Sequence, residues 1–111
     1  MTRRDYLGSF ELMVLLAVMQ LEDDAYGVPI ARTIEDTTGR PVALGSVYAA
    51  LDRLQARGLL ESSLGDPTPE RGGRAKRFFQ VSARGAQAAS ESRRTFTMLW
   101  QDLPDPGGNP A

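Results

Sequence analysis

The densest group of side chains able to bind a phosphate lies in one short, glycine-containing segment. Residues 70–77 read Glu-Arg-Gly-Gly-Arg-Ala-Lys-Arg, which places four cations in eight positions. Glycine lets the backbone and the arginine heads come close to a phosphate or a minor groove. The segment therefore predicts a DNA contact, with a charged turn that only aids solubility as the alternative. The residues predicted to make this contact are Arg71, Gly73, Arg74 and Lys76.

Charge is divided unevenly along the chain, although the net charge is only −1. Residues 1–70 hold six basic and 11 acidic residues, whereas residues 71–94 hold seven basic residues and one acidic residue. A basic segment in an otherwise acidic chain is typical of a local phosphate-binding surface. A solvated charged face is the alternative, and charge alone does not decide between the two.

A second candidate DNA contact is an amphipathic segment at residues 44–57. One face of this segment is apolar, with side chains at helical spacing: Val47, Ala50, Leu51 and Leu54. An α-helix fits the major groove, where short side chains near its leading end reach the base edges. The other face carries the candidate contacts, which are Ser46, Tyr48, Ala49 and Arg53.

Each of these four side chains has a role that its chemistry suggests. Ser46 can contact a base or a phosphate, and Ala49 can touch a thymine methyl group. Tyr48 can offer its hydroxyl to a phosphate or lie against the sugar, and Arg53 is predicted to clamp a phosphate. The alternative is an ordinary surface helix in which Tyr48 is half-buried against a neighbouring element.

A third candidate site is an apolar stripe near the C-terminal end. It consists of Phe96, Leu99, Trp100 and Leu103, whose spacing places them on one helix face. A single-domain helix-turn-helix protein usually needs a two-fold dimer to reach half-sites about 34 Å apart, so we expect this stripe to form a homodimer interface. Binding of a small aromatic effector at Trp100, between subunits, is the alternative role.

The elements that must position these residues follow from periodicity and from helix-ending residues. Helices are expected at about 6–21, 26–38, 44–57 and 83–103, and short strands at 59–64 and 77–81. Pro29 must lie in the first turn of the second helix, and Gly39 ends that helix. Ser82 is expected to cap the last helix at its N-terminus.

These elements predict an α+β fold that is mostly α. It is a winged helix-turn-helix domain with a C-terminal dimerisation helix. The expected division is a DNA-binding domain at 1–82, the dimerisation helix at 83–103 and a flexible tail at 104–111.

Composition excludes several classes of function. The 111 residues include no cysteine and no histidine, so disulfides, the usual zinc ligands and the commonest general base are absent. We therefore predict no enzymatic activity, no metal site and no cofactor. The longest apolar run, Leu12 to Met19, is too short to cross a bilayer. With no secretory signal pattern near Met1, the protein is expected to be cytoplasmic and to have no membrane partner.

Several short motifs occur in a fixed order along the chain. They are Ala25-Tyr26-Gly27, Leu44-Gly45-Ser46-Val47-Tyr48, Leu51-Asp52-Arg53-Leu54, Gly58-Leu59-Leu60-Glu61, the stretch 71–82 and Gly85. This ordered set resembles the PadR family of bacterial transcriptional regulators, over roughly residues 6–103. The resemblance implies a winged-helix homodimer, held by its first and last helices, that usually represses a nearby promoter.

The resemblance also implies which residues contact DNA. It implies Ser46 and Tyr48 of the third helix and the wing residues Arg71, Gly73, Arg74 and Lys76. Some members of the family hold aromatic drugs at the dimer centre, which keeps a ligand role for Trp100 open.

Two positions depart from the family pattern. Ala43 stands where a serine or threonine often caps the third helix, and the loss of such a cap costs about 1 kcal/mol. Phe78 and Phe79 stand where tyrosines are common, so we expect them to pack and not to bind phosphate.

The working hypothesis is a sequence-specific transcriptional regulator, a repressor that binds a palindromic operator in double-stranded DNA as a homodimer. Three alternatives stay open: a regulator that senses an aromatic small molecule, a winged-helix adaptor that binds another protein, and a small-molecule carrier built around Trp100.

Overall fold

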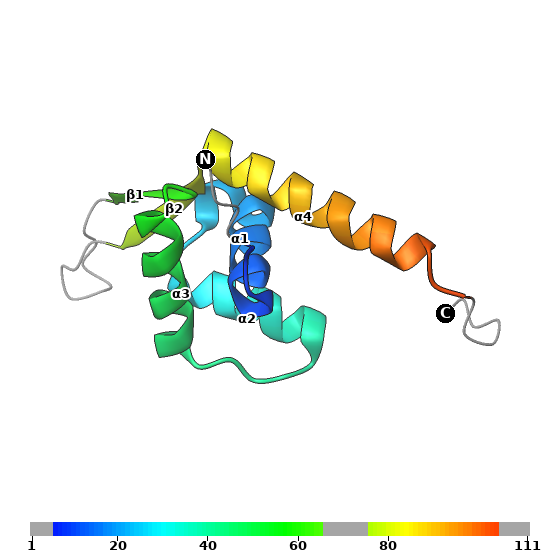
Figure 1. Cartoon of the computed structure of the whole chain (residues 1–111). Helices are drawn as coiled ribbons and strands as arrows, with labels where there is room; N and C mark the ends of the chain where they lie inside the picture. The colour runs from blue at the N-terminus through cyan, green and yellow to red at the C-terminus, as the bar shows by residue number, and fades with distance from the viewer. Residues whose placement is uncertain (1–5, 66–75, 105–111) are drawn as a thin grey trace.

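Three helices, a two-stranded hairpin and a long projecting helix make up the structure, a computed structural model that describes residues 6–65 and 76–104 (Figure 1). In chain order the elements are α1 (Ser9–Leu21), the 3-10 turn η1 (Glu22–Asp24), α2 (Gly27–Thr38), α3 (Leu44–Ala56), β1 (Leu60–Leu64), β2 (Arg77–Val81) and α4 (Ala83–Gln101). This is the winged helix-turn-helix arrangement with a C-terminal helix that the sequence predicts, mostly α with one small antiparallel sheet.

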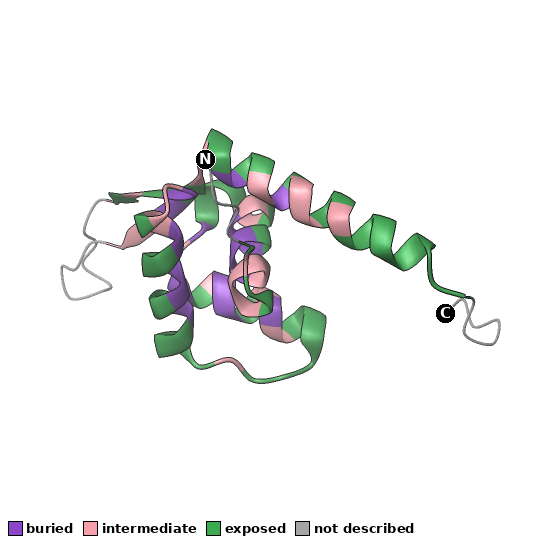
Figure 2. Ribbon diagram, in the orientation of Figure 1, coloured by how far each residue is buried: buried purple, intermediate pink, exposed green. Residues whose placement is uncertain are grey.

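The core lies where α1, α2 and α3 meet the base of the hairpin. Helix α3 buries the four apolar side chains that its periodicity singles out, namely Val47, Ala50, Leu51 and Leu54. In Figure 2 the buried stretches of the three helices face one another, while the outer side of α3 is exposed. No polar or charged residue is buried in the parts of the chain that the structure describes. The core therefore fixes the position of α3 through apolar packing and leaves its polar face to solvent.

Helix α1 is apolar on nearly all sides, and its buried arc is wider than a single stripe. Leu15 and Val18 are fully buried, whereas Leu16 between them is 41% exposed. The physical reason is that α1 packs against α2, α3, β2 and α4. With several neighbours, the burial of a helix residue depends on tertiary arrangement and not on one preferred face.

Helix ends follow the local signals closely. Pro29 lies in the first turn of α2, and Gly39 ends α2 in the left-handed conformation with φ 73°. The Ser82 side chain caps α4, accepting a hydrogen bond of 3.0 Å from the Gly85 amide. Helix α1 begins at Ser9 and not at residue 6, and α4 ends at Gln101, so Leu103 lies just beyond its helix.

The hairpin is joined firmly to the helices at its base. β1 and β2 pair antiparallel, with Ser62 opposite Phe79 and Leu64 opposite Arg77. Phe79 is buried in the core, and its amide donates a 2.8 Å hydrogen bond to the Ala25 carbonyl in the turn before α2. The packing role expected for this aromatic is therefore confirmed.

Two predicted features fall on residues outside the described part of the chain. The wing contacts predicted at Arg71, Gly73 and Arg74 lie between the strands at 66–75, and most of the predicted tail lies at 105–111.

Helix α4 packs against the body only through its first half. Gly85 and Ala89 are buried there, where α4 meets α1 and β2. A Cβ atom at Gly85 would overlap the Leu59 carbonyl oxygen, so only glycine permits this close approach of α4 to the hairpin. The second half of α4 extends away from the other elements (Figures 1 and 2). No helix in the described ranges is long and apolar enough to cross a membrane.

Candidate nucleic-acid interface

The leading end of α3 projects into solvent, and the loop before it is held in place by one side chain of α2. The Val42 amide donates a 2.8 Å hydrogen bond to the Glu35 carboxylate. As expected for Ala43, no side chain caps α3, so this loop contact takes over part of the positioning that a cap provides. Ser46, in the first turn, is exposed, and a Cβ at Gly45 would meet nothing within 4 Å. The first turn of α3 is thus open on the side that a DNA groove would occupy.

Three of the four predicted α3 contacts have no charged partner among the described residues, and they differ in how exposed they are. Ser46 and Ala49 are exposed on the outer face of α3. Tyr48 is 37% exposed, and its ring rests on the first residue of α2, because a Cβ at Gly27 would overlap its hydroxyl and ring carbons. The half-buried packing considered for this tyrosine is therefore present, and a phosphate contact by its hydroxyl stays a prediction.

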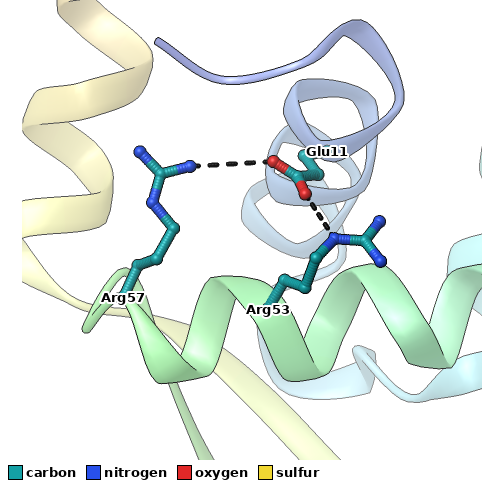
Figure 3. A network of polar contacts seen from close by, with 3 residues as sticks. All are labelled: Glu11, Arg53 and Arg57. Carbon is teal, nitrogen blue, oxygen red and sulfur yellow. Dashed lines mark hydrogen bonds and ion pairs between the residues drawn. The ribbon is translucent and has the colours of Figure 1, made fainter. Parts of the chain in front are cut away.

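Arg53, predicted to clamp a phosphate, is engaged by a residue that the motif analysis did not identify. Its Nε atom donates to Glu11 Oε2 at 2.5 Å, and Arg57 Nη1 lies 3.7 Å from Glu11 Oε1 (Figure 3). The signal in the sequence is that Glu11 is the one charged residue of the otherwise apolar α1. Arg53 is therefore a tethered cation, not a free one.

Lys76 lies at the base of the hairpin loop, against aromatic side chains. Its Nζ atom is 4.2 Å from the centroid of the Tyr26 ring, close enough for a cation–π contact of about 0.5–2 kcal/mol. Phe78 meets the same ring edge-on at 5.4 Å. Lys76 is thus held beside the start of α2.

Arg77 binds within the protein, although it belongs to the basic segment. Its Nη2 donates to Gln55 Oε1 at 2.6 Å, and its Nη1 lies 3.3 Å from Asp52 Oδ1. Its guanidinium carbon is 5.0 Å from the centroid of the Phe79 ring. Arg77 therefore connects β2 to the last turns of α3, so that the hairpin and α3 are linked by polar contacts as well as by the core.

The predicted DNA contacts fall into two groups on adjacent elements. Ser46, Tyr48 and Ala49 lie on the first half of α3 and Arg53 on its second half, whereas Lys76 directly precedes β2 of the hairpin, which packs against the end of α3 (Figure 1). The geometry of the wing residues between the strands lies outside the described ranges, so their predicted contacts stay predictions.

The C-terminal stripe is separate from this surface. Its four side chains are between 52% and 73% exposed: Phe96, Leu99, Trp100 and Leu103. An open hollow of about 380 Å³ is lined by Phe96, Thr97, Trp100 and Gln101. Within residues 6–65 and 76–104, no cluster of acidic side chains is arranged to hold a metal ion.

Comparison with known proteins connects this fold to one family. No curated protein matches the sequence, but solved structures do. A PadR-like transcription factor from Bacteroides fragilis superposes with a TM-score of 0.72 at 21% identity, covering 83% of this chain and 84% of the other. A PadR-like regulator from Bacillus cereus gives 0.68 at 22% identity, with 83% and 84% covered. A PadR family regulator from Clostridium difficile gives 0.71 at 16% identity, with 85% and 93% covered.

The family model gives the assignment that structural similarity at this low identity does not give alone. The model of the transcriptional regulator PadR-like family matches residues 15–91, from α1 through the hairpin to the first half of α4. This span is more than half of the chain and contains every element of the winged helix-turn-helix. The protein therefore belongs to the PadR-like family of transcriptional regulators, which are DNA-binding proteins and not enzymes.

Proposed function

We propose that the protein is a sequence-specific repressor that binds a palindromic operator as a homodimer. The observation that carries the proposal is the exposed leading turn of α3, on a PadR-like fold whose hairpin packs against the other end of the same helix. Short side chains at such a helix end allow close approach to base edges in the major groove. Repression is the direction that the resemblance to PadR regulators favours.

Each predicted residue has a place in this proposal. Ser46 and Ala49 read base edges, and Tyr48 supports the helix with its ring while its hydroxyl reaches the backbone. Arg53 and Lys76 contact phosphates, and the loop residues Arg71, Gly73 and Arg74 contact phosphates or the minor groove. The residue types and the exposure of Ser46, Ala49 and Arg53 support these roles.

Dimerisation is assigned to the C-terminal stripe. Three large apolar side chains are exposed along one face of α4 and a fourth, Leu103, just past its end, which is unusual on a protein that acts alone. Burying them against a second copy would remove this surface from water and place two α3 helices on one duplex. Leu16, exposed on α1, is a further apolar side chain that a partner could cover, since the resemblance implies a dimer held by the first and last helices.

The experiment that tests the proposal is selection from genomic DNA. The purified protein is mixed with sheared DNA of its source organism at about 0.15 M salt, where exposed charges are largely screened, and the retained DNA is sequenced. We expect a few sites that share an inverted repeat with half-sites about one helical turn apart. An Ala49→Trp variant is the control, because a bulky ring on the exposed face blocks groove entry without entering the core. Retention of no DNA, or of all sequences equally, would contradict the proposal.

An aromatic effector is a second candidate function, favoured by the hollow at Trp100. Planar aromatic ligands stack on indole rings, and the hollow lies on the stripe proposed to dimerise. Since Trp100 is the single tryptophan, its fluorescence reports binding directly. We expect an effector of this class to quench that fluorescence and to release the operator at the same concentrations. Quenching without release would assign the hollow to a carrier and not to a sensor.

A further inference from the structure

An acidic side chain from α1 lies among the cations of the proposed DNA-reading face. Ser46, Ala49 and Arg53 follow one another along the exposed face of α3, and Glu11 approaches the last of them from the neighbouring helix. The Glu11 side chain is only 18% exposed, whereas the Arg53 side chain is 55% exposed. The carboxylate is therefore held inside, with the arginine as the part that DNA can reach.

The contact fixes the direction of the Arg53 guanidinium. Glu11 binds its inner nitrogen, Nε, and Figure 3 shows the two terminal nitrogens pointing away from the carboxylate. An arginine fork that is held at Nε still presents two parallel donors, which suit a bidentate contact with phosphate or guanine. The second carboxylate oxygen faces Arg57, so one acid orients two arginines one helical turn apart.

We propose that Glu11 is a positioning residue that determines DNA specificity, by orienting Arg53 and Arg57 and by weakening their attraction for phosphates in random sequence. The inference rests on the proposed DNA-binding function. It assigns to an acid in α1 a part in a contact made by α3.

Glu11 affects specific and non-specific DNA binding to different extents. Non-specific affinity depends on how many phosphates the protein neutralises, because each neutralised phosphate releases condensed counterions. Glu11 cancels one of the two positive charges beside it, and so lowers this sequence-independent term. A base or phosphate contact that requires the Arg53 guanidinium in this orientation depends on geometry, so Glu11 does not weaken it. The acid therefore lowers binding to random DNA more than binding to the operator.

The direct test is Glu11→Gln, measured with two duplexes. One is the duplex most enriched in the genomic selection, and the other is a scrambled duplex of the same length and composition. Affinity for the scrambled duplex should rise about threefold to tenfold, and the slope of log affinity against log salt should steepen by about 1 as Arg53 loses its carboxylate partner. Operator affinity should rise less, so the ratio of the two affinities should fall. A misfolded variant would lose affinity for both duplexes, so the expected gain cannot arise from misfolding.

Two further variants separate orientation from net charge. Glu22→Gln removes the same charge at an exposed position at the end of α1, and should leave the affinity ratio unchanged. Arg53→Lys keeps the charge but loses the planar fork, so it should lower the ratio without steepening the salt slope. Adding Glu11→Gln to Arg53→Ala should change the ratio less than Glu11→Gln does alone.

Failure of the inference and failure of the proposed function give different results. If the unaltered protein discriminates between the duplexes and Glu11→Gln leaves the ratio intact, or matches Glu22→Gln, the inference is wrong while the proposed function stands. If the unaltered protein binds neither duplex, or both equally, the proposed function and the inference fall together.

Discussion

The ring of Tyr48 resting on Gly27 shows how one side chain can fix the orientation of α3, the helix proposed to contact DNA. The contact joins α3 to the first turn of α2, and Gly27 is buried because the tyrosine covers it. No other residue type at position 27 would leave space for the ring. Tyr48, which the sequence motif predicts to contact DNA, thus also packs within the protein and holds α3 against α2.

Replacing Gly27 by alanine should therefore destabilise the protein. The added methyl group overlaps Tyr48, and forcing an extra methyl group into a packed site typically costs about 1–3 kcal/mol. The free energy of unfolding in urea measures the loss. Gly45→Ala is the matched control, because that position is helical and open, and should be unchanged or more stable by up to about 1 kcal/mol. Equal stability of the two variants would show that the tyrosine moves aside without cost.

At the scale of elements, Arg77 links the hairpin to α3. One guanidinium contacts Gln55 and Asp52 on α3 and lies over Phe79. Much of the strength of exposed ion pairs is lost to solvent, so the link serves geometry more than stability. It sets where the hairpin stands relative to the face that carries Ser46.

Arg77→Met should loosen this link while it keeps the apolar stem. We expect unfolding free energy to fall by less than about 1 kcal/mol, because the pair is exposed. Operator affinity should fall by about fivefold, as the loss of about 1 kcal/mol of positioning implies. Arg32→Met, on the exposed side of α2, removes the same charge and is the control. If both variants lose equal affinity, net charge and not hairpin position accounts for the effect.

The sequence predicts a helix or strand well when the residues that begin, end and pattern it lie close together in the chain. The periodicity of α3, the glycine at the end of α2 and the serine cap of α4 each depend on residues within one or two turns, and all three are present as expected. The buried arc of α1 depends on several neighbours, so helical spacing alone does not show that Leu15 is buried while Leu16 is exposed.

The candidate site was less predictable for the same reason. Glu11 and Arg53 are 42 positions apart, and no local pattern pairs them. In the sequence, Arg77 is simply one more cation of the basic segment, because only the fold brings its partners on α3 close to it. The exposed positions of Ser46 and Ala49 followed directly from helical spacing.

At the scale of the whole molecule, the apolar half of α4 and the DNA-reading half of the chain lie apart. The stripe on α4 extends beyond the body, so a second copy can bind it without covering α3 (Figure 1). If the stripe forms the dimer as proposed, mutations can therefore alter association and DNA binding separately.

Leu99→Glu should disrupt the proposed dimer. A charge placed in the centre of the stripe must be desolvated for a second copy to bind, which is costly when the charge is unpaired. We expect a monomer by analytical ultracentrifugation, and at least about a tenfold loss of affinity for the inverted repeat as the second half-site is lost. Affinity for a single half-site should stay unchanged. Ser90→Glu, exposed on the same helix but off the stripe, should remain dimeric.

The junction between the hairpin and α4 has a mechanical consequence. One residue, Ser82, separates β2 from α4, and its hydroxyl both donates to the Gly58 carbonyl at 2.7 Å and caps the helix. Gly85 also packs closely on Leu59, so α4 is joined rigidly to the winged-helix body that carries α3. In a dimer joined through two such helices, the separation of the two α3 helices would be fixed, and it would fit one operator length. Each base pair inserted between the half-sites turns one of them by about 35° around the duplex. A rigid dimer cannot rotate one α3 helix to follow that turn, so it would lose one of its two half-sites.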